Sequence, residues 1–252
     1  MKMYIVEIYY PGTWLELEDR DIAFEIEGML RHLVDLVMEA ALTLSFFEQS
    51  QNALRNPKDE WEQDAALRGE IDAQLRAEVG DLYFQDFDRF RLESERRLRA
   101  KKVELGIIPR AYLYKIPFIH AHSFVYAVDS FGKFLDELCD YEVTPTKVKD
   151  YRDEFDGKLP SVRKIRNSAL HIEDRLRRYA SWKDKKKGKK MEVDGFLGLS
   201  NLEGNNLCYT IDDGSYQKIE ISGATLSILV ETANKVLASF VWRGWPRLEP
   251  QH

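Results

Sequence analysis

The stretch KLPSVRKIRNSALHIEDRLRRY, residues 158–179, brings together features that no other part of the chain combines. Pro160 favours the start of a helix, because the N–H that it lacks would have no partner in a first turn anyway. After it, apolar residues recur at three- and four-residue steps, the period of one helix face. They are Ile165, Ala169, Ile172, Leu176 and Tyr179. The stretch therefore predicts one amphipathic helix that buries this stripe and exposes a cationic, histidine-containing face.

The composition is that of a helical globular protein. The chain has 252 residues, 44% hydrophobic and 32% charged, with few Gly and Pro, so it can form one large domain or two small ones. The net charge of −6 excludes a surface that is basic throughout, but it leaves room for a local nucleic-acid site. Cys139 and Cys208 indicate reduced thiols rather than a disulfide framework. The apolar N-terminus, interrupted by Glu7, is too short for a signal peptide or a membrane span, so we expect a soluble cytoplasmic protein without a membrane partner.

The same apolar periodicity predicts further long helices on both sides of the central stretch. Asp19 or Asp21 is expected to cap the first of them, whose pattern fades between Asn52 and Pro57. The charged segment 58–104 predicts one long or two broken helices, solvated on one face. Further helices are expected over 109–140, where Pro117 either kinks the helix or marks its start, and over 146–157 and 223–241.

β-Structure is expected only in short pieces. Residues 3–10 predict a strand, and the runs 196–199, 206–211 and 216–221 predict an antiparallel meander in which Asp213-Gly214 forms a hairpin turn. The lysine run 183–190 is expected to be a mobile loop, and the tail from Arg243 is expected to be frayed.

Together these elements predict a mainly α fold, a long-helix bundle with a small antiparallel β-meander before the last helix. We expect residues 1–182 to form the bundle, with 58–104 as a long charged helical insertion. Residues 183–252 are expected to add the lysine-rich loop, the β-meander and the C-terminal helix, packed on the bundle.

The sequence lacks the motifs of the most easily recognised enzymes: a Walker loop, GxGxxG, HExxH, CxxC and GxSxG. His120 and His122 lie two residues apart in an apolar helix, so they point to different sides and cannot easily clamp one metal ion. We expect both to be packed or hydrogen-bonded in the core. No metal site and no cofactor are therefore predicted.

One motif remains, R-N-S-A-L-H at residues 166–171. It resembles the signature of the HEPN superfamily, an Arg and a His separated by four to six residues, often with a polar residue directly after the Arg. The resemblance covers about residues 20–180 and implies a helical, metal-independent endoribonuclease, often with two copies meeting in a dimer cleft. It also implies a toxin or phage-defence effector with RNA, a homodimer partner and an antitoxin or regulatory protein as partners. By the same resemblance Arg166 and His171 are the catalytic pair, and Asn167 is a positioning residue.

The chemistry of these side chains fits RNA cleavage. An imidazole with a pKa near ~6.5 can move protons at the 2′-hydroxyl or the leaving oxygen around neutral pH. A guanidinium offers a planar fork of donors to the phosphorane oxygens. On an ideal helix Asn167 and His171 lie one turn apart on one face, whereas Arg166 is about 140° from His171 and has to curl across the surface.

Further basic residues extend the cationic face and are expected to hold RNA phosphates without reading sequence. They are Arg163, Arg175, Arg178, Lys185, Lys186 and Lys187. Trp182 could stack on bases, whereas Tyr179 falls on the core stripe. The alternative to an endoribonuclease is a non-catalytic helical module that binds RNA, a nucleotide or a partner protein, in which His171 pairs with Glu173 or Asp174.

Overall fold

The computed structural model describes residues 3–52 and 57–251, with side chains for all of these except 57–60. The chain divides into two compact units, Met1–Gln49 with Pro117–His252 and Ser50–Ile116. The fold is mainly α with small antiparallel sheets, which confirms the fold class predicted from the apolar periodicity.

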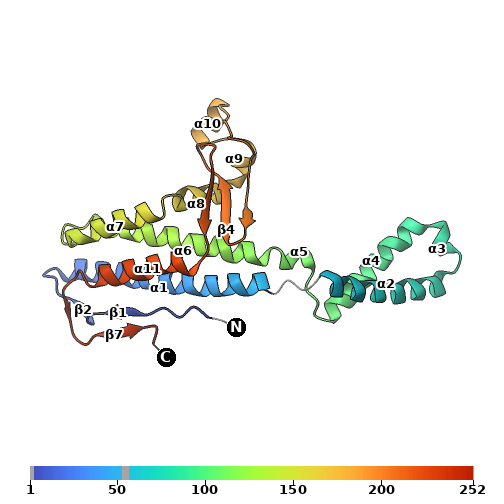
Figure 1. Ribbon diagram of the computed structural model, residues 1–252, viewed down its shortest axis with the longest axis horizontal. Helices are drawn as coiled ribbons and strands as arrows, with labels where there is room; N and C mark the ends of the chain where they lie inside the picture. Colours follow the sequence, from blue (N-terminus) through green and yellow to red (C-terminus); the bar gives the residue numbers. More distant parts are fainter. Residues whose placement is uncertain (1–2, 53–56, 252) are drawn as a thin grey trace. The chain divides into compact units, whose positions relative to one another are not determined.

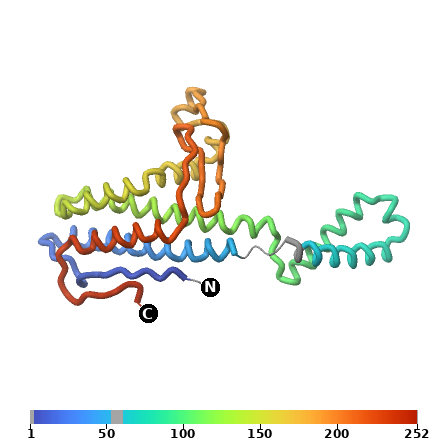
Figure 2. The backbone as a smooth tube through the Cα atoms, viewed as in Figure 1, coloured from blue at the N-terminus to red at the C-terminus, as the bar shows by residue number. Residues whose placement is uncertain are grey.

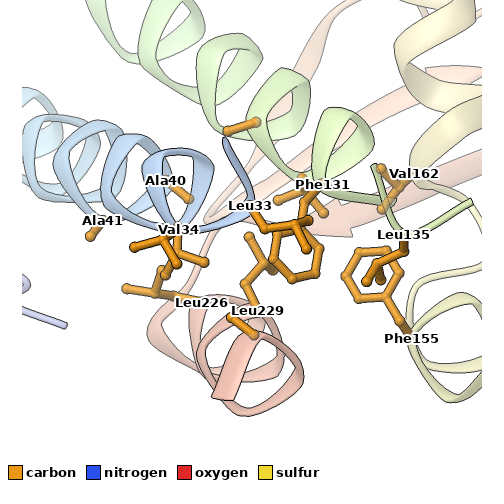
Figure 3. Packing of buried hydrophobic residues seen from close by; sticks show 14 of the residues in the cluster. Leu33, Val34, Ala40, Ala41, Phe131, Leu135, Phe155, Val162, Leu226 and Leu229 are labelled. Carbon is orange, nitrogen blue, oxygen red and sulfur yellow. The ribbon is translucent and has the colours of Figure 1, made fainter. Parts of the chain in front are cut away.

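A bundle of helices forms the core of the larger unit. It contains α1 (Arg20–Asn52), α6 (Ile116–Cys139), α7 (Thr146–Lys158) and α11 (Gly223–Leu237), whose arrangement Figure 1 shows. Each helix contributes one apolar stripe to a shared core, in which the Phe131 and Phe155 rings lie 5.3 Å apart between centroids. Figure 3 shows this packing, with Leu33 and Val34 of α1 near Leu226 and Leu229 of α11.

Local signals set the ends of two of these helices. Asp19 Oδ1 accepts hydrogen bonds from the backbone N–H groups of Asp21 (2.9 Å) and Ile22 (3.2 Å), so Asp19 rather than Asp21 caps α1. Pro117 lies in the first turn of α6 and therefore marks the start of that helix rather than a kink. The apolar pattern of α1 is predicted to fade between Asn52 and Pro57. Most of that segment, residues 53–56, lies outside the described residues.

The β-meander consists of β3 (Asn201–Glu203), β4 (Asn206–Thr210) and β5 (Tyr216–Glu220), in the order β3-β4-β5 with antiparallel pairs. Gly214 forms the predicted turn between β4 and β5 with a φ of 87°, a conformation that favours glycine. The expected strand over 196–199 is absent. The Gly198 N–H donates to the Thr210 side chain at 2.9 Å, so among the described residues one backbone hydrogen bond joins this segment to β4, from the Thr210 N–H to the Gly198 carbonyl at 2.7 Å. A single such contact does not make a ladder.

The two ends of the chain form a ribbon, which Figure 2 traces as the blue and red segments running alongside each other. β1 (Ile8–Tyr10) pairs with β7 (Arg247–Glu249), and β2 (Trp14–Leu15) pairs with β6 (Trp242–Arg243), both antiparallel. The prediction of a frayed tail from Arg243 is therefore wrong. The N-terminal strand is shorter than predicted, since only residues 8–10 of 3–10 form it.

The smaller unit is a helical hairpin with its own core. It contains α2 (Pro57–Val79), α3 (Leu82–Gln85), α4 (Phe87–Glu104) and α5 (Arg110–Leu113), so the charged segment 58–104 is helical as expected. Ile71, Leu75, Tyr83 and Leu98 form its small buried cluster. Arg97 also bridges the hairpin by donating to both carboxylate oxygens of Glu78 at 2.7 and 2.8 Å.

The central stretch is not one helix. It forms α8 (Val162–Leu170) and α9 (Ile172–Leu176), with a break at His171, where φ is −116° and ψ is 40°. The predicted burial of Ile172 and Leu176 is wrong, since they are 40% and 66% exposed. Ile165 and Tyr179 are buried as predicted, and Ala169 is partly buried.

Candidate nucleic-acid interface

α8 is held against α6 by an ion pair that involves the first residue of the motif. Arg166 donates to Asp129 Oδ2 through both Nε (2.7 Å) and Nη2 (2.6 Å). The Asp129 side chain is 2% exposed and the Arg166 side chain 13%. Removing one partner of such an enclosed pair costs roughly 3–5 kcal/mol. A phosphate at Arg166 therefore has to compete with a carboxylate that already holds the guanidinium.

Two more cations converge on the same acidic positions of α6. Lys133 Nζ lies 2.9 Å from Asp129 Oδ2, and Arg163 Nε lies 3.5 Å from Asp129 Oδ1. Arg163 also donates to Asp136 Oδ2 at 2.9 Å, and this hydrogen bond raises the pKa of Arg163. Asp129 Oδ1 itself accepts no hydrogen bond within the described residues. The predicted phosphate contact Arg163 is thus half-exposed but already engaged by carboxylates.

His171 lies at the break between α8 and α9. Its backbone N–H donates to the Asn167 carbonyl at 3.1 Å, while its ring is exposed and Asn167 is partly buried. The structure therefore keeps Asn167 and His171 one turn apart, whereas Arg166 points into the ion pair with α6. The three residues of the predicted catalytic set are close along the chain, but Arg166 is engaged by Asp129 whereas the His171 ring is exposed.

The side chains that follow His171 bring possible metal ligands together. His171, Glu173 and Asp174 each offer one ligand atom, and these atoms lie within 4.8 Å of one another. Asp174 Oδ1 also accepts a hydrogen bond from Lys185 Nζ at 2.6 Å, and this contact lowers the pKa of Asp174. Asp174 is thus already paired with Lys185, and the exposed His171 lies beside this salt bridge.

Arg175 has a different place from the one predicted. Its side chain is buried, and it donates to the carbonyls of Tyr179 (2.6 Å) and Ala180 (2.9 Å) and to Ser168 Oγ (3.2 Å). Burial lowers the pKa of Arg175. The guanidinium donates to the turn after α9 and stabilises it, so it is not available to bind a phosphate.

The lysine run is helical where a loop was predicted, and α10 spans Trp182–Lys187. Ser181 caps it by accepting from the Asp184 N–H at 3.2 Å, and Gly188 ends it with a φ of 65°. Lysines in the last turn complement the negative end of the helix dipole. The prediction of a mobile loop is therefore wrong, because both ends of a short helix are capped.

A cationic surface surrounds α9 and α10, and we call it the α9–α10 surface. Its exposed members are His171, Arg177, Arg178, Trp182, Lys183, Lys186, Lys187, Lys189 and Lys190. Residues 171–190 carry nine Lys and Arg side chains and only three Asp and Glu, in a chain whose net charge is −6. Of the predicted RNA contacts, Arg178, Lys186 and Lys187 lie exposed here, whereas Lys185 is partly buried beside Asp174.

Three residues that pair around Arg163 and Arg166 were missed at the level of sequence, and all lie on α6: Asp129, Lys133 and Asp136. His122, Tyr126, Asp129, Lys133 and Asp136 follow one another at three- and four-residue steps, which is one polar stripe in an apolar helix. That spacing is the signal that could have found them. His122 Nε2 lies 2.7 Å from the Tyr209 hydroxyl, and the His120 ring packs 5.6 Å from Phe46, so both histidines are packed or hydrogen-bonded as expected.

Comparisons of the chain with protein families, with curated proteins and with solved structures find no match. Within residues 3–52 and 57–251, no helix combines the length and the apolar character needed to cross a membrane.

Proposed function

We propose that this protein binds RNA through the α9–α10 surface. The observation that carries the proposal is the concentration of seven exposed Lys and Arg side chains within residues 171–190 of a chain whose net charge is −6. A local basic patch is the electrostatic footprint of a nucleic-acid site, and it attracts phosphates whatever the net charge of the whole protein. Lys186 and Lys187 are exposed in the last turn of α10, where phosphates can approach them.

Binding has better support than chemistry at the RNSALH motif. The cation that would stabilise a phosphorane, Arg166, is mostly enclosed and paired with Asp129. The exposed lysines of α10 need no such partner exchange before they meet a phosphate. Proteins that hold RNA by its backbone require only cations and stacking side chains, both of which this surface offers.

The test compares the double variant K186Q/K187Q with wild type in RNA binding measured at several salt concentrations. Each lost phosphate contact is expected to make the slope of log affinity against log salt shallower by about 0.7. K147Q/K149Q, which removes two exposed lysines from α7, is the matched control and should leave the slope unchanged. Equal slopes for the α10 variant and wild type would contradict the proposal.

A metal-independent endoribonuclease, as in HEPN toxin or defence effectors acting as homodimers, is the second candidate. The observation that favours it is the exposed ring of His171 at the edge of the α9–α10 surface, where it could move protons for a bound RNA. In this candidate Asp129 orients Arg166, and Asn167 positions His171. An antitoxin or other regulatory partner would then control the site.

Cleavage of RNA in EDTA by wild type, H171A and H32A tests this second candidate. His32 is an exposed histidine on α1, so H32A is the control for loss of an imidazole. The candidate predicts that only H171A loses cleavage, while its RNA affinity stays close to that of wild type. Cleavage that needs a divalent cation would contradict the metal-independent candidate and would indicate a metal ion bound by His171, Glu173 and Asp174.

A further inference from the structure

Trp182 is the largest exposed apolar side chain of the α9–α10 surface. It is 61% exposed at the first position of α10, and Lys186 Nζ lies over its ring, 3.8 Å from the centroid. A tryptophan in this position gains little from the core of the protein. Exposed lysines follow it along the chain at Lys183 and Lys187, so a nucleic acid drawn to them comes close to the indole.

We infer that Trp182 stacks on an unpaired base, so that the α9–α10 surface takes single-stranded rather than duplex RNA. This inference rests on the proposed function and names its substrate class. Bases within a duplex are covered on both faces by their neighbours, whereas bases in a single strand can stack on an aromatic side chain. Stacking of this kind is tolerant of sequence, because every base has a π-face.

The local structure prepares the indole for this role. The Ser181 cap and the left-handed Gly188 fix both ends of α10, which keeps Trp182 and Lys186 one turn apart on the same side. The ammonium over one face of the ring is held by a cation–π contact. From this position the Lys186 ammonium can neutralise the phosphate of a nucleotide whose base stacks on Trp182.

The neighbouring aromatic residue is not equivalent. Tyr179 is buried, and its ring is approached by Lys190 Nζ at 3.9 Å and by the Arg177 guanidinium at 5.4 Å. A base cannot reach it without moving these side chains and opening the turn that Arg175 holds through the Tyr179 carbonyl. Of Tyr179 and Trp182, Trp182 is therefore the one available for stacking.

The experiment measures binding of wild type, W182A and W182F to a fluorescein-labelled oligouridine and to a labelled RNA duplex of the same length. Loss of the indole is expected to weaken oligouridine binding by about 5- to 150-fold, the range for one stacked base. Duplex binding, which uses phosphates alone, should change less than about twofold. W182F keeps an aromatic face and should retain most of the oligouridine affinity.

W245A supplies the matched control, because Trp245 is 87% exposed in the segment between β6 and β7 and should not contact RNA. Equal effects of W182A on both RNAs, or no effect on oligouridine, would overturn the inference while leaving the proposed RNA binding intact. A folded wild type that binds neither RNA would overturn both. Quenching of tryptophan fluorescence by oligouridine in wild type but not in W182F would support stacking directly.

Discussion

Arg166 and Arg175 are both arginines of one 22-residue stretch, and the structure gives neither of them the free guanidinium that a phosphate site needs. Arg166 is engaged by Asp129 of α6, and Arg175 by the carbonyls of Tyr179 and Ala180. At the scale of the residue, the cations of this region that are available to a ligand are the exposed ones of the α9–α10 surface. The short helix α10, which carries several of them, has no buried residue.

The structural role of Arg175 predicts a loss of stability when it is replaced. R175M keeps most of the side-chain volume but leaves two carbonyl groups and Ser168 without their donor. We expect the free energy of unfolding to fall by about 2–3 kcal/mol, measured by urea denaturation. R177M, at an exposed neighbour, should change it by less than about 0.5 kcal/mol. Equal effects of the two substitutions would show that the buried hydrogen bonds add nothing to stability.

At the scale of the element, the break at His171 divides the central stretch into a part that packs on the core and a part that is exposed. α8 packs against β4 and β5 on one side and pairs with α6 through Arg166. α9 and α10 then turn away, so that Ile172 and Leu176 become exposed and the lysines gather on one surface. An uninterrupted helix would have spread the same cations along its whole length.

The contact between α6 and β4 predicts a dependence of stability on pH. Burial lowers the pKa of His122, whose ring meets the Tyr209 hydroxyl. Below the ordinary value of about 6.5 the unfolded chain binds a proton that the folded chain does not, so stability rises with pH through this window and is lost as the pH falls. The difference in unfolding free energy between wild type and H122Q should therefore shrink from pH 7.5 to pH 5. A difference that stays constant over this range would contradict the prediction.

At the scale of the whole molecule, the N-terminal and C-terminal segments of the chain pair with each other as strands in the larger unit. β7 pairs with β1 across more than 230 residues of sequence, and Trp242 of β6 lies edge-on to Tyr10 with 5.7 Å between ring centroids. Trp242 Nε1 also donates to the Leu237 carbonyl at 2.8 Å, which ties the ribbon to the end of α11. The ribbon is thus part of the folded unit.

Truncation after Phe240 tests this pairing. Removing residues 241–252 deletes β6, β7 and the packing of Trp242, and we expect the free energy of unfolding to fall by about 2–4 kcal/mol. Truncation after Glu249 keeps both strands and is the control, for which no more than about 0.5 kcal/mol is expected. The measurement is urea denaturation of each form. A frayed tail would instead make the two truncations equivalent.

The fold class and most helices could be predicted from the sequence because their signals are local. The apolar period of α1, α6 and α11, the Asp19 cap and the Gly214 turn each depend on residues close together in the chain. Part of the candidate site was local too. The exposure of Lys186 and Lys187 could be predicted from residue type, because exposure is the default for charged side chains, whereas the pairing of Lys185 with Asp174 could not.

The sequence by itself determined that this protein is a helical bundle with a short β-meander and a basic segment, since these follow from periodicity and charge. Only the tertiary structure decided that Arg166 is paired, that Arg175 is buried, and that the tail forms strands. The physical reason is the same in each case. The deciding partner, whether Asp129, a turn carbonyl or β1, meets the residue only after the chain has folded, so no local pattern carries that information.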